Sequence, residues 1–255
     1  MGLKFLSNNL LDAATITAST ENAQYPASNL LDSRRTKTYR STTNSDNIVI
    51  DFGTAESIDH FAIVDNWQNG FGITTITIEA NATDVWTSPA FTTTATLDTT
   101  FGVSVKAFPA ESYRFWRLVL TSTLGYCEIA NMFLGAATDI ATNGVGYNWE
   151  YANNDLSRQS INRYGQKFID DIGSQKELSN LQFQVMDKDE IDSILSVYDN
   201  NRTVKPFFIY LDLETDSLFN NDDRFNGFYY FKESPSFINI TSGYYNTSLN
   251  LIEAK

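Results

Sequence analysis

Cysteine and histidine are almost absent from this chain, which has one of each among its 255 residues. Cys127 has no partner for a disulfide within the chain, and its apolar surroundings in GYCEIANMFLG predict that it is buried. The histidine, His60, lies within a predicted strand, and we expect it to be structural. One histidine and one cysteine leave little from which to build a catalytic triad or a zinc site.

Long apolar runs are also missing. The opening segment MGLKFLSNNLLDAA lacks the basic start and apolar run of a signal peptide, and no stretch approaches the about 18 apolar residues of a membrane span. We therefore expect synthesis in a cytoplasm and no membrane span.

Basic residues are scarce: 18 Lys and Arg stand against 31 Asp and Glu, for a net charge of -13. Both halves are acidic, with 8 basic against 13 acidic residues in 1–136 and 10 against 18 in 137–255. Affinity for nucleic acids comes largely from Lys and Arg that displace counterions, so specific nucleic-acid binding is not expected. A repelling surface would nevertheless leave DNA free to pass.

Catalytic groups of other kinds are not evident. Adjacent carboxylates such as Asp170 and Asp171 point to opposite faces of a strand, which does not suit a glycosidase pair, and no glycine-rich phosphate loop is present. We expect that the protein is not an enzyme.

Short apolar clusters separated by Gly, Asn and Asp fill the first half, as in IVIDFG, IDHFAIVDN and FGITTITIEA. Such clusters, with 14% aromatic residues, indicate strands and turns. The segment 136–146 is small, polar and glycine-containing, which marks a boundary between two predicted domains, 1–136 and 137–255.

The second half predicts an α+β unit on an antiparallel sheet. Residues 146–155 and 156–172 are expected to form two long strands of a hairpin, and LSNLQFQVM alternates as a half-buried strand does. One helix is predicted to follow, with Asp187 as N-cap, Glu190 completing a capping box, and one apolar face made of Ile191, Ile194, Leu195 and Tyr198. The fold class is therefore mainly β.

Four segments of the first half resemble the discoidin, or coagulation-factor type C, family of galactose-binding-like jelly rolls: ASNLLDSRRTKTYRS, IVIDFG, SYRFWRLVL and EIANMFLG. The chain departs from the family pattern at Ser33, where the family has Gly, and at Tyr39, where it has Trp. The resemblance implies a jelly-roll β-sandwich that binds ligands through loops at one end.

Many members of that family hold a calcium ion in the first loop. The resemblance implies Asp32 and Glu128 as its carboxylate ligands, completed by oxygens near Asn29 and Arg34 and by the Thr38 hydroxyl. The alternative is that Asp32 caps a turn and Glu128 pairs with Arg34, Arg35 or Arg40.

Sugar recognition in such modules uses aromatic faces together with polar side chains. The loop DNWQNGFG offers Asn66, Trp67, Gln68 and Asn69 as candidate sugar ligands. The alternative for Trp67 is packing at the rim of the core.

The second half resembles the tail-tube, distal-tail and tail-hub proteins of bacteriophages in its order of strands, helix and strands, including KPFFIYLDL. The resemblance implies a ring, commonly a hexamer, with an acidic bore, and contacts with other tail proteins. The first strand, LKFL, is a candidate to pair with this second sheet.

The leading hypothesis is therefore a structural protein of a bacteriophage tail, of the distal-tail, hub or minor-tail type. It would reside in the virion at the tail tip and could contact a host surface glycan. The alternatives are a carbohydrate-binding lectin or adhesin with an accessory domain, and an appended non-catalytic module of a glycoside hydrolase.

Overall fold

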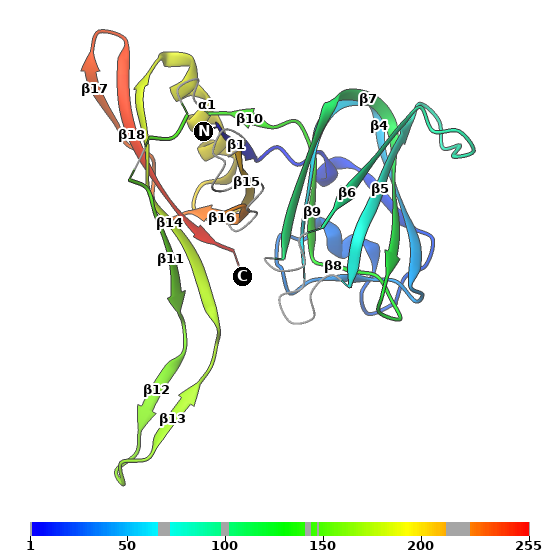
Figure 1. Cartoon of the computed structure of the whole chain (residues 1–255). Coiled ribbons are helices and arrows are strands. Elements are labelled where there is room, and N and C mark those ends of the chain that lie inside the picture. Colours follow the sequence, from blue (N-terminus) through cyan, green and yellow to red (C-terminus); the bar gives the residue numbers. More distant parts are fainter. Residues whose placement is uncertain are drawn as a thin grey trace.

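The computed structural model describes residues 2–65, 72–97, 102–140, 144–146, 148–212 and 225–254 (Figure 1). A six-stranded sheet builds a β-sandwich, and an eight-stranded antiparallel sheet with one α-helix builds a second domain beside it. The prediction of a mainly β chain with these two parts is confirmed. Among the residues described, no helix is long and apolar enough to cross a membrane.

Strands β4 and β7 are the longest elements of the sandwich and pair along their whole length. Their register shifts between Asp51 and Glu56, and the pair curves over there, so that β9 can pair with the second half of β4 (Figure 1). Trp116 fills the core with no exposed surface, against the rings of Phe91 and Phe108. The elements of this domain are η1 (Leu10–Ala13), β2 (Thr15–Ala18), η2 (Ala27–Leu31), β3 (Tyr39–Arg40), β4 (Ser45–Val64), β5 (Ile73–Asn81), β6 (Phe91–Thr96), β7 (Val103–Ser122), β8 (Glu128–Ile129) and β9 (Asn131–Gly135).

The second domain takes its strands from both ends of the chain. Its sheet has the order β10-β1-β15-β16-β18-β14-β11, with β17 pairing with β18. These elements are β1 (Gly2–Leu6), β10 (Thr138–Asp139), β11 (Glu150–Asp155), β14 (Ser174–Met186), α1 (Lys188–Asn201), β15 (Phe207–Asp212), β16 (Gly227–Phe231), β17 (Phe237–Thr241) and β18 (Tyr244–Glu253). The prediction that LKFL pairs with this sheet is confirmed, because β1 pairs with β15 over its five residues and with β10. The sandwich is thus inserted between two strands of one sheet.

The predicted helix is confirmed together with its start. Asp187 accepts a hydrogen bond from the Glu190 backbone, and the Glu190 side chain accepts one from the Asp187 backbone, as a capping box requires. Ile191 and Ile194 are buried in the core of the second domain.

The hairpin predicted between 146–155 and 156–172 is wrong in its pairing, because these two segments do not pair with each other and the second is not one long strand. β11 pairs with β14, and the separate pair β12 (Arg158–Ile161) and β13 (Lys167–Asp170) extends it into an arm that projects from the domain (Figure 1). The breaks have a local cause: Asp155 accepts from the backbone of Ser157, and Asp171 accepts from that of Gly173. Such Asx turns compete with the hydrogen bonds of a β-ladder.

Cys127 is fully buried, as predicted, and burial raises the pKa of its thiol to about 11. Because the thiolate is the reactive form, the native protein is expected to resist a thiol reagent at about pH 8, whereas the urea-unfolded protein reacts completely. A Ser33→Cys variant, which places a thiol at an exposed position, is the positive control. Rapid labelling of Cys127 in the folded wild-type protein would contradict this prediction.

Apolar side chains also join the two domains. Phe208 of β15 and Phe228 of β16 stack at 4.6 Å between ring centroids and belong to one cluster with buried residues of the sandwich. The sandwich side of this cluster consists of Ala62, Val64, Val103, Ala130 and Phe133. The two domains therefore share an apolar contact.

Candidate ligand-binding site

Loops from distant parts of the sequence meet at the end of the sandwich opposite the curved β4–β7 pair (Figure 1). Backbone hydrogen bonds link them: Asp65 donates to Gly102, Thr123 to Gly72, and Ser41 to Cys127. The predicted sugar ligands Asn66, Trp67, Gln68 and Asn69 come between β4 and β5 in the sequence, and they lie outside the residues that the structure describes.

Arg40 lies between two tyrosine rings at this loop end. Its guanidinium carbon is 4.5 Å from the ring centroid of Tyr25 and 4.4 Å from that of Tyr126. Its Nη2 also lies 3.1 Å from both carboxylate oxygens of Glu128, which is buried. Arg40 is thus held by cation–π contacts on its two faces and by a carboxylate at its end.

The backbone fixes these residues independently of their side chains. The short β3–β8 ladder places Arg40 opposite Glu128. A turn that starts at Asn22 closes on the same strand, because Arg40 donates to the Tyr25 carbonyl at 3.0 Å and accepts from the Asn22 backbone at 2.8 Å. The cluster of Tyr25, Arg40 and Tyr126, here called the Tyr-Arg-Tyr cluster, is therefore preorganised. All three side chains are partly exposed to solvent.

The residues predicted to hold calcium lie in the neighbouring loop and are engaged by protein groups. The Asp32 carboxylate accepts hydrogen bonds from the Arg34 backbone and guanidinium, and this guanidinium lowers the pKa of Asp32 to about 2. Asn29 donates to the carbonyl of Thr38 at 2.7 Å. These are the contacts of the alternative interpretation, in which Asp32 caps a turn and Glu128 pairs with Arg40.

The structure does bring the predicted pairs Asn29 with Thr38 and Asp32 with Arg34 together. Glu128 instead faces Arg40, so both candidate carboxylates are already neutralised by arginines. Within the described part of the chain, no group of three or more His, Cys, Asp or Glu side chains could hold a metal ion. The residues as arranged do not fit a calcium ion, and calcium binding stays a prediction.

Sequence reasoning named Arg40 only as an ion-pair partner and missed Tyr25 and Tyr126. Both tyrosines lie in loops, beside Pro26 and Cys127, and nothing in the spacing of two loop residues shows that they meet. The usable signal was chemical, since a large aromatic residue in a polar loop is a candidate for a binding surface.

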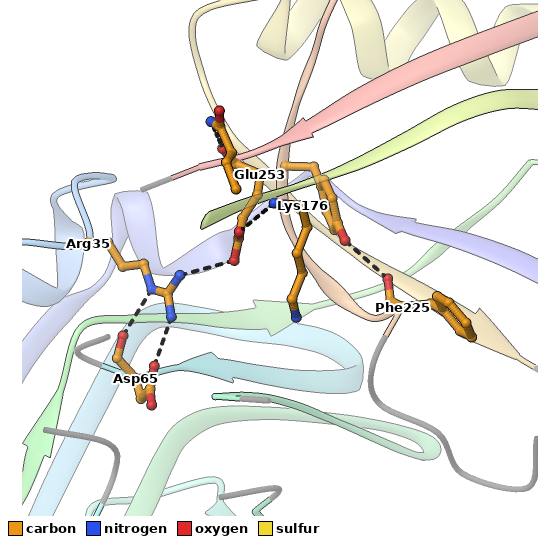
Figure 2. A network of polar contacts seen from close by, with 7 residues as sticks. Arg35, Asp65, Lys176, Phe225 and Glu253 are labelled. Atoms are coloured by element: carbon orange, nitrogen blue, oxygen red, sulfur yellow. Dashed lines mark hydrogen bonds and ion pairs between the residues drawn. The ribbon is translucent and has the colours of Figure 1, made fainter. Parts of the chain in front are cut away.

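A buried ionic network closes the loop end against the second domain (Figure 2). Arg35 binds the Asp65 carboxylate at 2.8 Å and the Glu253 carboxylate at 3.3 Å, and it also donates to the Asp65 carbonyl. Burial raises the pKa of Asp65 in spite of its arginine partner. Because Glu253 ends β18, this network holds the loops of the sandwich in a set position on the second sheet.

A cavity of about 220 Å³ lies at the junction of the two domains. Its charged lining residues are Asp12, Asp32 and Lys205. Lys205 binds Asp12 at 2.6 Å, and Arg34 binds Asp32, so both carboxylates are paired. This cavity thus offers a ligand no unpaired charge, and the loop end is the better candidate site.

Comparisons with known proteins concern the sandwich alone. No protein-family model matches the chain, and no curated protein matches it in sequence. The structural neighbours over about half of the chain are carbohydrate-binding modules.

Three solved structures illustrate these neighbours. The chitosan-binding module 1 from the chitosanase/glucanase of Paenibacillus sp. IK-5 is 21% identical at a TM-score of 0.41, over 51% of this chain and 99% of that chain. A mutant of this module gives the same identity and TM-score over 50% and 98%. The family 32 module from C. perfringens NanJ, in complex with galactose, is 16% identical over 52% of this chain and 98% of that chain, at 0.43. A fucose-binding module of Streptococcus pneumoniae is 11% identical over 51% and 98%, at 0.44.

Proposed function

We propose that the sandwich is a non-catalytic module that binds a glycan at its loop end. The observation that carries this proposal is the Tyr-Arg-Tyr cluster, in which Tyr25 and Tyr126 flank Arg40. Partly exposed tyrosines offer rigid, amphipathic surface to the apolar face of a sugar at little entropic cost. A guanidinium carries several N–H donors; the Nε of Arg40 is buried and its Nη2 binds Glu128, so the Nη1 donors are those that can serve sugar hydroxyl groups.

The Tyr-Arg-Tyr cluster is also preorganised, which favours binding. A ligand that binds a surface already held in place does not have to order it, so more of the contact energy appears as affinity. Here the Arg40 side chain is fixed by Glu128 and the two rings, and the backbone beneath it by the β3–β8 ladder. The four segments that resemble discoidin domains lie in this same sandwich, which agrees with the proposal.

The proposal predicts a loss of glycan binding when the cluster is opened. Galactose, fucose and chitosan oligosaccharides are suitable first probes, followed by a glycan array. For a bound sugar, Tyr126→Ala and Arg40→Met are each expected to weaken binding by about 10- to 100-fold, which corresponds to about 1.5 to 3 kcal/mol for a charged hydrogen bond or a lost ring contact. Titration calorimetry measures the change.

Tyr164→Ala is the matched control, because Tyr164 is an exposed tyrosine at the tip of the projecting arm. It is expected to bind as the wild type does. The proposal fails if the wild-type protein binds no glycan, or if Tyr126→Ala and Arg40→Met bind a sugar with unchanged affinity while remaining folded.

A second candidate function is that of a ring-forming structural protein of a bacteriophage tail, resident in the virion and made in the host cytoplasm. The observation that favours it is the arm formed by β12 and β13, which projects with apolar side chains uncovered (Figure 1). Such a protein would contact copies of itself and other tail proteins, and its acidic surface would leave DNA free to pass. Electron microscopy of the purified protein tests it: rings are expected, of about six subunits if the resemblance to phage tail proteins holds.

A further inference from the structure

The arm formed by β12 and β13 exposes several large apolar side chains to solvent. Every residue from 163 to 171 is exposed. The exposed fractions are 70% for Ile161, 74% for Tyr164, 56% for Phe168 and 60% for Ile169. Two-stranded hairpins are marginally stable in water, and a concentration of uncovered apolar side chains marks an interaction surface.

The register of the arm gathers two of these side chains on one face. Gln159 pairs with Ile169, and Ile161 pairs with Lys167, so Ile161 and Ile169 are diagonal neighbours on the same side of the hairpin. Gln159 and Lys167 lie on the same face beside them, and the pair Ile161 and Ile169 is here called the arm strip.

A second uncovered apolar surface lies at the opposite end of the second sheet, near β17 (Figure 1). Ile238 and Ile240 of β17 are 68% and 45% exposed, and the register with β18 shifts between Asn239 and Thr241, which leaves Ile240 without a partner on β18. Val185 of β14 is 49% exposed, and its backbone binds Asn246, the partner of Ile238 on β18. These three side chains form what is here called the β17 patch.

The β17 patch lacks the usual protection of a sheet edge. Among the strands that the structure describes, β17 pairs with β18 alone. Residues 234–252, which include both strands up to Ile252, contain no charged side chain. Natural edge strands are normally guarded by charges, so an apolar and uncharged edge is suited to contact with another chain.

The charges around the two surfaces are opposite. The arm contains Arg158, Arg163 and Lys167, and its acidic residues, Asp155, Asp170 and Asp171, lie at its base, so the excess of positive charge is at the turn. Arg158 faces Asp170 across the hairpin, which leaves Arg163 and Lys167 nearest the turn. Val185 of the β17 patch lies just before the start of α1, where residues 187–192 contain four acidic residues and one lysine.

We propose that the arm strip of one copy docks on the β17 patch of a second copy of this chain. The two surfaces both expose apolar side chains and have opposite charge beside them, and they lie at opposite ends of one domain, so that they meet only between molecules. Contact between two different surfaces is head-to-tail, and it closes into a ring or continues as a filament. The proposal rests on the self-assembly in the second candidate function and is independent of glycan binding.

The test uses the full-length protein and sedimentation velocity over a range of concentrations. An arm variant, Ile161→Thr with Ile169→Thr, and a patch variant, Ile238→Thr with Ile240→Thr, each remove one surface at exposed positions with a residue that suits strands. The dissociation constant for self-association of each variant is expected to be at least about tenfold higher than that of the wild type, because each variant loses two side chains of the contact. Val204→Thr, at a residue that is 75% exposed elsewhere, is the matched control and is expected to assemble normally.

Mixing the two variants gives the sharpest result. The patch variant retains an arm strip and the arm variant retains a β17 patch, so an equimolar mixture is expected to form a one-to-one dimer and nothing larger. Circular dichroism verifies that both variants are folded. Association of the wild type is also expected to weaken as salt is added, since the flanking charges are exposed.

The outcomes separate this contact from assembly in general. A wild-type protein that stays monomeric at every concentration overturns both the contact and the ring. A wild type that assembles, with arm and patch variants that assemble equally well, overturns the contact alone. An arm variant that is monomeric beside a patch variant that still assembles shows an arm-to-arm contact, which also overturns the proposal.

Discussion

Replacement of Arg35 by methionine is expected to lower the free energy of unfolding by about 3 to 5 kcal/mol, the range for removal of one partner from a buried ion pair. Arg35 is 6% exposed and binds the carboxylates of Asp65 and Glu253, which are themselves 6% and 7% exposed (Figure 2). Without the guanidinium, the two buried carboxylates lose the one cation that binds both of them, and Lys176, which also favours the charge of Asp65, remains nearby. Burial already raises the pKa of Asp65 with Arg35 present, which shows how strongly this site disfavours its charge.

The neighbouring arginine supplies the matched control. Arg34 also binds a carboxylate, that of Asp32, but its side chain is 66% exposed. Exposed ion pairs contribute about 0 to 1 kcal/mol, so Arg34→Met is expected to change the stability by no more than that. Urea denaturation followed by circular dichroism compares the two variants. Equal effects at the two positions would show that the buried network does not join the domains as described.

The pH dependence gives a second measure of the same network. A carboxyl whose folded-state pKa is raised stabilises the folded protein at low pH, and this contribution is lost as the pH rises through the folded-state pKa. Asp65 has such a pKa, and removal of Arg35 raises it further. The deficit of Arg35→Met relative to the wild type is therefore expected to be largest at neutral pH and to shrink as the pH is lowered toward about 4, where Asp65 can be protonated.

Local sequence signals predicted the parts of the fold that depend on local physics. The helix start followed from Asp187 and Glu190, three residues apart, because a capping box is satisfied within one turn. Burial of Cys127 followed from its apolar neighbours. Each of these features is determined by side chains within a few positions of one another.

The candidate site shows why the remainder was missed. Tyr25 and Tyr126 meet only because both pack on Arg40, and Arg35 reaches Glu253 over 218 positions of sequence. Contacts of this kind depend on how the two sheets pack, which neither periodicity nor spacing records. The breaks in the long hairpin were missed for the opposite reason: Asp155 and Asp171 form local turns that override a favourable strand pattern.

Truncation of Phe5 to alanine is expected to destabilise the second domain by about 3 to 5 kcal/mol, although the residue lies at the start of the chain. Phe5 is fully buried, and its ring lies 5.2 Å from that of Phe207 and 6.1 Å from that of Phe231. Those two rings come from β15 and β16, more than 200 positions away, so the first strand fills the core of the last strands. Its removal leaves a cavity that the rigid sheet on either side closes only in part.

Lys4→Ala is the control for Phe5→Ala, because Lys4 is the adjacent residue and its side chain pairs with Asp139 at 3.8 Å on a partly exposed face. It is expected to cost less than about 1 kcal/mol. Hydrogen exchange locates the effect: amides of β14, β16 and β18 should lose protection in Phe5→Ala, while those of β4 and β7 in the sandwich should lose less. Equal loss in both domains would mean that they unfold as one unit, and no loss in either would mean that β1 is not integral to the sheet. Because β1 precedes the inserted sandwich and pairs beyond it, the expected result is selective loss, with the sandwich retained as a domain on a weakened support.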